Sequence, residues 1–126
     1  VADLFLDGRW PHGDVEYVYA PGNVWAVGAA FWALGPSVLV ERLVGLAYRA
    51  LLIWGLYRPA RPWGRGTATV AALTAWVLLA PFGLVAHPWL CGLALLCAGT
   101  ALVIDGGARW STAVGAGLLG LAVFHQ

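Results

Sequence analysis

The chain has 126 residues, of which 61% are hydrophobic and 10% are charged, and its formal net charge is +1. A soluble domain of this size buries too little of its surface to hide so much apolar area, so the composition argues against a soluble protein and predicts a chain covered by lipid. The few charges form no basic stripe interleaved with aromatic residues, which argues against nucleic-acid binding.

Residues 1–22 are the polar part of the chain and are predicted to form an arm at the membrane surface. They hold four of the six acidic residues and are interrupted by Gly and Pro. A secretory signal peptide has a basic start and an unbroken apolar core, and this segment has neither. We therefore divide the chain into an N-terminal polar or interfacial arm, 1–22, and a bundle of transmembrane helices, 23–126.

The segment 23–57 is open to three interpretations. Gly35 and Pro36 interrupt it, and Ser37 is a good N-cap for a following helix. We favour a short half-span or interfacial helix at 24–35 and a full span at 38–57, because the first helix reaches only about 17 Å and a bilayer core is about 30 Å thick. The alternatives are one long kinked helix and two thin spans that meet near residues 40–42.

A polar turn at 58–65 sets the predicted orientation. It contains three Arg, two Pro and one Gly, which stop a helix and mark the loop as cytoplasmic. The following span then leaves the cytoplasm, the next turn lies outside, and the loop 105–109 is cytoplasmic again. This is the topology of a multi-pass protein of a prokaryotic inner or cell membrane.

Residues 66–104 contain no Asp, Glu, Lys or Arg, and His87 and Pro88 lie near their middle. A helix needs about 20 apolar residues to cross the hydrocarbon core, so this run is long enough for two spans. We predict them at 67–86 and 89–104, with the turn between them on the outer side.

Pro81 lies within the first of these predicted spans. Because it has no N–H, it leaves the carbonyl of Val77 without the usual helical partner. We expect a kink at this point, with the hydroxyl of Thr74 helping to satisfy the freed carbonyls.

The last predicted span, 110–125, is rich in small residues. Pairs of Gly and Ala four positions apart form ridges that allow another helix backbone to approach closely, within the chain or from a partner. The predicted helix-packing residues are Ala113, Ala116, Gly117 and Gly120, with a similar pair at Ala94 and Ala98 in the preceding span. The fold class predicted from the whole sequence is thus all-α, a polytopic integral membrane protein with about four transmembrane helices.

Three charged residues lie closest to membrane depth: Glu41, Arg42 and Arg49. On a helix that begins after Ser37, Glu41 and Arg49 share a face with Gly45 and Tyr48. An ionised group at the bilayer centre costs at least about 2.5–3.5 kcal/mol, so we expect Arg49 to face protein, water or the acid of a partner.

His87 and His125 are predicted to lie on the same side of the membrane, where two imidazoles can bind a haem or a metal. No HxxxH, CxxCH or acidic group accompanies them, so they remain, with Arg49, weak candidates for binding a cofactor, and we predict neither a cofactor nor a metal. Cys91 and Cys97 are six residues apart on one predicted helix, too far for a disulfide, and are interpreted as packing residues.

The eight Trp residues fall into two groups. Most lie near the ends of the predicted spans, where an amphipathic ring anchors a helix in the headgroup layer. Trp32, Trp54 and Trp76 lie deeper, and we expect them to pack against neighbouring helices.

Residues 106–111, with the sequence GGARWS, resemble the glycine-rich Gly-Gly-Arg-Trp-Ser loop of small four-helix membrane proteins of the DoxX type. The resemblance covers six residues. It implies a redox subunit associated with quinone or haem.

The sequence contains no acid–base pair, nucleophile or metal cluster that would indicate an enzyme. Glycine ridges and abundant Trp instead favour a small non-catalytic membrane subunit that packs into and stabilises a larger assembly. Its partners are then the lipid bilayer and other membrane subunits or a second copy. The alternatives are a quinone- or haem-associated subunit of the DoxX-like kind and a component of a pore, holin or transporter.

Overall fold

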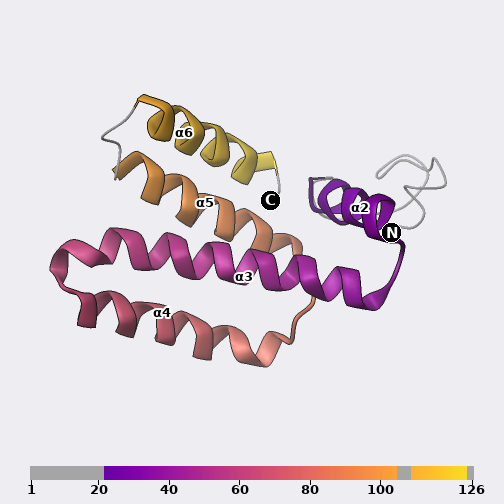
Figure 1. Cartoon of the computed structure of the whole chain (residues 1–126), viewed down its shortest axis with the longest axis horizontal. Coiled ribbons are helices and arrows are strands. Elements are labelled where there is room, and N and C mark those ends of the chain that lie inside the picture. The colour runs from indigo at the N-terminus through magenta and orange to yellow at the C-terminus, as the bar shows by residue number, and fades with distance from the viewer. Residues whose placement is uncertain (1–21, 105–108, 125–126) are drawn as a thin grey trace.

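The computed structural model describes residues 22–104 and 109–124, and every regular element within them is a helix (Figure 1). The predicted all-helical class is therefore confirmed for the part described. The predicted arm 1–22 lies, except for its last residue, outside the described residues. The elements are α2 (Gly22–Leu34), α3 (Val38–Ala60), η1 (Arg61–Trp63), α4 (Arg65–Leu79), η2 (Ala80–Phe82), α5 (Pro88–Ile104) and α6 (Arg109–Phe124).

The segment 35–37 separates α2 from α3, as the favoured interpretation predicted. Gly35 has φ +84°, which ends α2, and its N–H donates to the carbonyl of Phe31 at 2.8 Å. The N–H of Val40 donates to Ser37 Oγ at 3.2 Å, which caps α3. The alternatives of one long kinked helix and of two helices that meet near residues 40–42 are wrong, because α3 runs without interruption through those residues.

The end of α3 differs from the prediction, which stopped the helix at residue 57. The helix continues through Pro59 to Ala60, and η1 follows before the chain breaks at Gly64 with φ +108°. Proline fixes φ near the helical value, so it can occupy the last turn of a helix, although it donates no hydrogen bond and its ring crowds the carbonyl four residues earlier. The positive φ of Gly64, rather than the prolines, ends the helical path.

The predicted helix 67–86 is also too long. The helix α4 ends at Leu79, and η2 and Gly83, with φ +58°, turn the chain away. The reason lies in Pro81, which cannot continue the hydrogen-bond ladder, followed by a glycine that accepts the left-handed conformation. The carbonyl of Val77, expected to be left without a partner, accepts the N–H of Ala80 instead. The expected kink is therefore the end of the helix.

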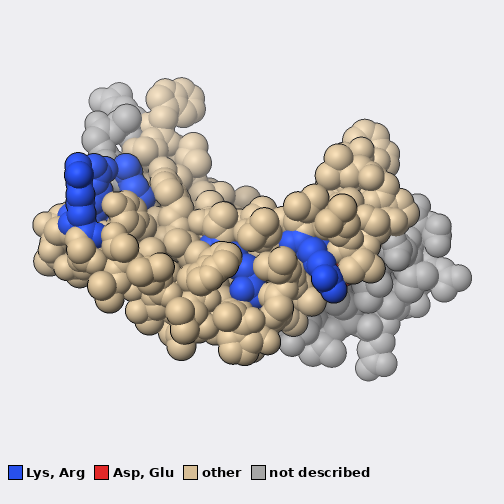
Figure 2. Space-filling model, turned by 60° about the horizontal axis from the view of Figure 1, so that its bottom comes forward, with Lys and Arg blue, Asp and Glu red and all other residues tan. Residues whose placement is uncertain are grey.

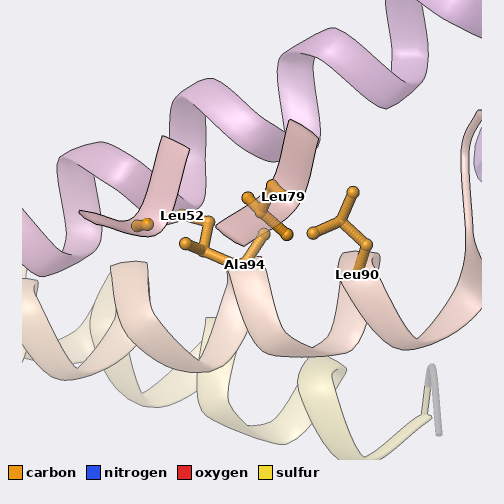
Figure 3. Packing of buried hydrophobic residues seen from close by; sticks show 5 residues of the cluster. Leu52, Leu79, Leu90 and Ala94 are labelled. Atoms are coloured by element: carbon orange, nitrogen blue, oxygen red, sulfur yellow. The ribbon is translucent and has the colours of Figure 1, made fainter. Parts of the chain in front are cut away.

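Four helices lie side by side in the order α4, α3, α5, α6 (Figure 1). The helix α2 packs against the N-terminal part of α3 and also touches α5. The main apolar core lies where α3, α4 and α5 meet, and Figure 3 shows its side chains pointing toward one another. It consists of Leu52, Ala75, Leu79, Leu90 and Ala94.

Small residues bring the helix backbones together. A Cβ atom at Gly55 of α3 would lie 2.6 Å from the backbone nitrogen of Ala98 in α5. Gly99 of α5 and Gly115 of α6 meet in the same manner, and a Cβ at either would lie within 2.8 Å of the carbonyl oxygen of the other. Ala94, which was predicted to form a ridge with Ala98, is fully buried, as is Ala98. Close backbone contact thus sets the positions of α3 and α6 against α5.

Large apolar side chains are exposed on each of α2, α3, α4, α5 and α6. The expectation that the deeper Trp residues pack against neighbouring helices is wrong for Trp32, which is 83% exposed, and Trp54 and Trp76 are partly exposed, at 37% and 49%. Small residues occupy the helix crossings, so the bulky rings point outward. An apolar exterior of this extent is typical of a protein that is covered by something other than water.

By length and composition, the run Arg65–Phe82 is the one helix among the residues described that is able to cross a membrane. The apolar helices Gly22–Leu34, Pro88–Ile104 and Trp110–Ala122 are shorter. The helix α3 has 23 residues, but its charged residues lower its mean hydropathy.

The α3–α5 crossing can be tested with one matched pair of substitutions. Gly55→Ala should lower the free energy of unfolding by about 1–3 kcal/mol, because the added methyl group overlaps the backbone of α5. Gly66→Ala is the control, since no atom lies within 4 Å of a Cβ there and the change itself favours a helix. Thermal unfolding in mild detergent measures both. Equal melting temperatures for the two variants would contradict the close crossing.

Candidate functional site: a buried arginine at the α4–α5 connection

One face of α3 is in close contact with the connection between α4 and α5, residues 83–87. Gly45 lies on this face, and a Cβ atom there would overlap the carbonyl oxygen of Leu84 and lie 2.9 Å from the carbonyl carbon of Val85. Only glycine allows the connection to rest directly on the helix. Arg49 follows one turn later on the same face.

Arg49 is 3% exposed, although it carries a full positive charge. Its Nη1 donates to the carbonyl oxygen of Leu79 at 2.8 Å, and its Nη2 donates to the carbonyl oxygen of Gly83. Leu79 is the last residue of α4, where the helix dipole is negative, and Gly83 follows directly after η2. The guanidinium therefore caps α4 from a neighbouring helix.

One of the hydrogen-bond donors of Arg49 has no partner. Its Nε is the one buried side-chain nitrogen or oxygen among the described residues that has no hydrogen-bond partner. A buried N–H without a partner costs about 1–3 kcal/mol. Two carbonyl contacts thus balance the cost of burying the cation, and loss of either leaves it poorly compensated.

A second set of hydrogen bonds holds the same connection from α2. Asn23, 6% exposed, donates from Nδ2 to the carbonyl oxygen of Ala86 at 3.1 Å. Its Oδ1 accepts a hydrogen bond from the hydroxyl of Tyr48, also at 3.1 Å. Arg49, Gly45 and Asn23 therefore act on successive parts of one segment, from the end of α4 to the start of α5.

The three predicted charged residues have different surroundings. Arg49 faces protein, one of the expected surroundings, but what it binds is backbone carbonyls rather than the acid of a partner. Arg42 is exposed and Glu41 is half-buried, both in the first turns of α3. Arg42 and Arg49 are seven residues, about two turns, apart on α3, and they differ in burial because only Arg49 lies under the α4–α5 connection.

His87 lies in an aromatic cluster beside the connection. Its ring stacks on Trp89 with centroids 5.8 Å apart and meets the edge of Phe82 at 6.4 Å. His125, the other candidate ligand, lies outside the described residues. Within 22–104 and 109–124, no group of three or more His, Cys, Asp or Glu side chains is placed to hold a metal ion. Cys91 and Cys97 form no disulfide: Cys91 is buried, and Cys97 packs against the main apolar core.

The predicted ridge on α6 does not pack against the described part of the chain. All four of its residues, Ala113, Ala116, Gly117 and Gly120, are exposed. No atom lies within 4 Å of a Cβ built at either glycine. At 100° per residue the ridge lies opposite Gly115, which makes the contact with α5 that the sequence analysis did not predict.

Comparison with protein-family models, with curated proteins and with solved structures finds no match. The resemblance of residues 106–111 to the DoxX-type loop is therefore not supported by a family match. The first three of these residues also lie outside the described part of the chain.

The role of Arg49 predicts a graded response to substitution. Arg49→Ala should destabilise the protein by about 1–3 kcal/mol for each carbonyl left without a partner. Arg49→Lys should recover part of this loss, because one ammonium group replaces the planar fork that reaches both oxygens. Arg42→Ala, on an exposed side chain of the same helix, is the control and should change little.

The measurement is thermal unfolding in mild detergent for the three variants. If Arg49→Ala melts at the same temperature as Arg42→Ala, the carbonyl contacts contribute nothing to stability and the assignment fails.

Proposed function

We propose that the chain is a polytopic integral membrane protein that packs, without catalytic chemistry of its own, into a larger membrane assembly. In this arrangement α3, α4, α5 and α6 cross the bilayer, while α2 is a half-span or interfacial helix. The apolar exterior and the helix lengths support the crossing. At 1.5 Å per residue, α3 reaches about 35 Å, and α4 with η2, α5 and α6 reach about 24–27 Å.

The orientation follows from Arg58, Arg61 and Arg65. Loops rich in Arg stay in the cytoplasm, so the turn between α3 and α4 is cytoplasmic. The connection between α4 and α5 then lies on the outer side, the loop 105–109 is cytoplasmic, and α6 ends outside. This topology is that of a prokaryotic inner or cell membrane.

The exposed ridge on α6 is the observation that carries the role as a subunit. A helix face of Gly and Ala offers no advantage in contact with lipid tails. It does favour contact with a second helix, because the backbone of that helix can approach closely. Among the described helices α6 is the last in the row, and it is in contact with α5 on one side. The partner that completes the packing is then another membrane subunit or a second copy of this chain.

This role is tested by substitutions on the ridge. Gly117→Leu or Gly120→Leu should reduce recovery of the native assembly about tenfold, because a bulky side chain keeps the partner helix away. Leu118→Ala, which trims a half-buried neighbour, should reduce it less. Both Leu variants should keep the melting temperature of the isolated chain, since nothing within residues 22–104 and 109–124 lies near either glycine.

Native gels and co-purification in mild detergent give the recovery. Equal recovery from all variants would remove the packing role of the ridge. A series of oligomers that contain only this chain, together with conductance in liposomes, would favour the pore or holin alternative over a subunit of a mixed complex.

A further inference from the structure

The charges of the chain are unequally divided between its two ends. Arg58, Arg61 and Arg65 lie where α3 passes into α4, and Figure 2 shows a group of basic side chains together at one end of the molecule. The start of α6 lies at the same end (Figure 1), with Trp110 in its first turn. We define the basic rim as Arg58, Arg61, Arg65, Trp63 and Trp110.

The side chains of the basic rim are open to their surroundings. Arg61 and Arg65 are exposed, Trp63 is 75% exposed and Trp110 is 82% exposed. Arg58 is half-buried and lies over the ring of Trp54, with Cζ 6.0 Å from the ring centroid. Three cations and two exposed indole rings thus belong to the same end of the helices.

The opposite end has no such excess of positive charge. Its charged side chains in the described part of the chain, Glu41 and Arg42, are adjacent and opposite in sign. Residues 1–21 precede α2 in the sequence, and Asn23 in the first turn of α2 binds the α4–α5 connection. By sequence, residues 1–21 carry four acidic residues and one Arg, a formal charge of −3.

We propose that the basic rim binds the phosphate headgroups of anionic phospholipids in the leaflet that it faces. This inference rests on the proposed membrane-spanning arrangement. The planar guanidinium group fits phosphate oxygens in a bidentate manner, and the ring of an exposed Trp prefers the headgroup layer. Each Arg near an anionic surface strengthens the attraction by about fivefold at moderate ionic strength.

The experiment measures lipid preference directly. The full chain is reconstituted into vesicles that contain phosphatidylcholine and phosphatidylglycerol, with bromine on the acyl chains of one lipid or the other. Quenching of tryptophan fluorescence by each brominated lipid gives the preference for the anionic lipid. We expect the wild type to prefer phosphatidylglycerol over phosphatidylcholine severalfold. This preference should fall as the salt concentration is raised, because exposed charges are screened.

Substitutions locate the preference on the rim. Arg61→Gln and Arg65→Gln, both on exposed side chains, should each lower it about fivefold or less, and the pair should nearly abolish it. Arg42→Gln, at the opposite end, is the control and should leave it unchanged. Equal preference in the wild type, the pair and the control would overturn the inference.

Two further experiments are needed. One distinguishes lipid headgroups from free phosphate as the ligand, and the other distinguishes failure of the proposed function from failure of this inference. Inorganic phosphate, added in place of chloride at equal ionic strength, should leave the lipid preference unchanged. A loss of preference would indicate a site for free phosphate and overturn the lipid assignment. Flotation of the vesicles tests membrane insertion itself: a chain that floats with neither lipid contradicts the proposed function, whereas one that floats equally with both and shows no preference contradicts only this inference.

Discussion

The position of the helices depends on the contact between the guanidinium of Arg49 and the carbonyls at the end of α4. Pro81 and Gly83 end α4 and turn the chain, so that the carbonyl oxygens of Leu79 and Gly83 face Arg49 of α3. A buried cation without partners and buried carbonyls without partners are each costly, so the two groups stabilise each other. Because the connection that follows rests on Gly45, the start of α5 is fixed, and α6 takes its place from α5.

This contact also explains how α3 can cross a bilayer in the proposed arrangement. Arg42 and Arg58 are 16 positions apart, about 24 Å along the helix, so each reaches one headgroup layer. Arg49 lies about 10 Å from the level of Arg42, close to the middle of the span, where a cation that faces lipid costs about 2.5–3.5 kcal/mol or more. Packed against carbonyl dipoles, the guanidinium is kept out of the hydrocarbon.

The sequence predicted the helices well because their boundaries depend on local signals. Gly35 and Ser37 separate α2 from α3, and the uncharged run 66–104 contains two helices with a turn near His87. The partners of Arg49 were not predictable, since a backbone carbonyl is present at every residue and no side chain marks it. The contact of Gly99 with Gly115 was missed for a related reason: several small residues could form it, and only the rotation of α6 about its axis decides which do.

The membrane-spanning arrangement is tested most directly by the accessibility of its two turns. Cysteine is introduced at Pro62, beside the basic loop, or at Leu84, in the α4–α5 connection, in a chain whose Cys91 and Cys97 are replaced by Ala. A membrane-impermeant maleimide should label Leu84→Cys in intact cells, and it should label Pro62→Cys only after the membrane is permeabilised. Labelling of both positions from the same side would show that α4 does not cross the bilayer and would contradict the proposed topology.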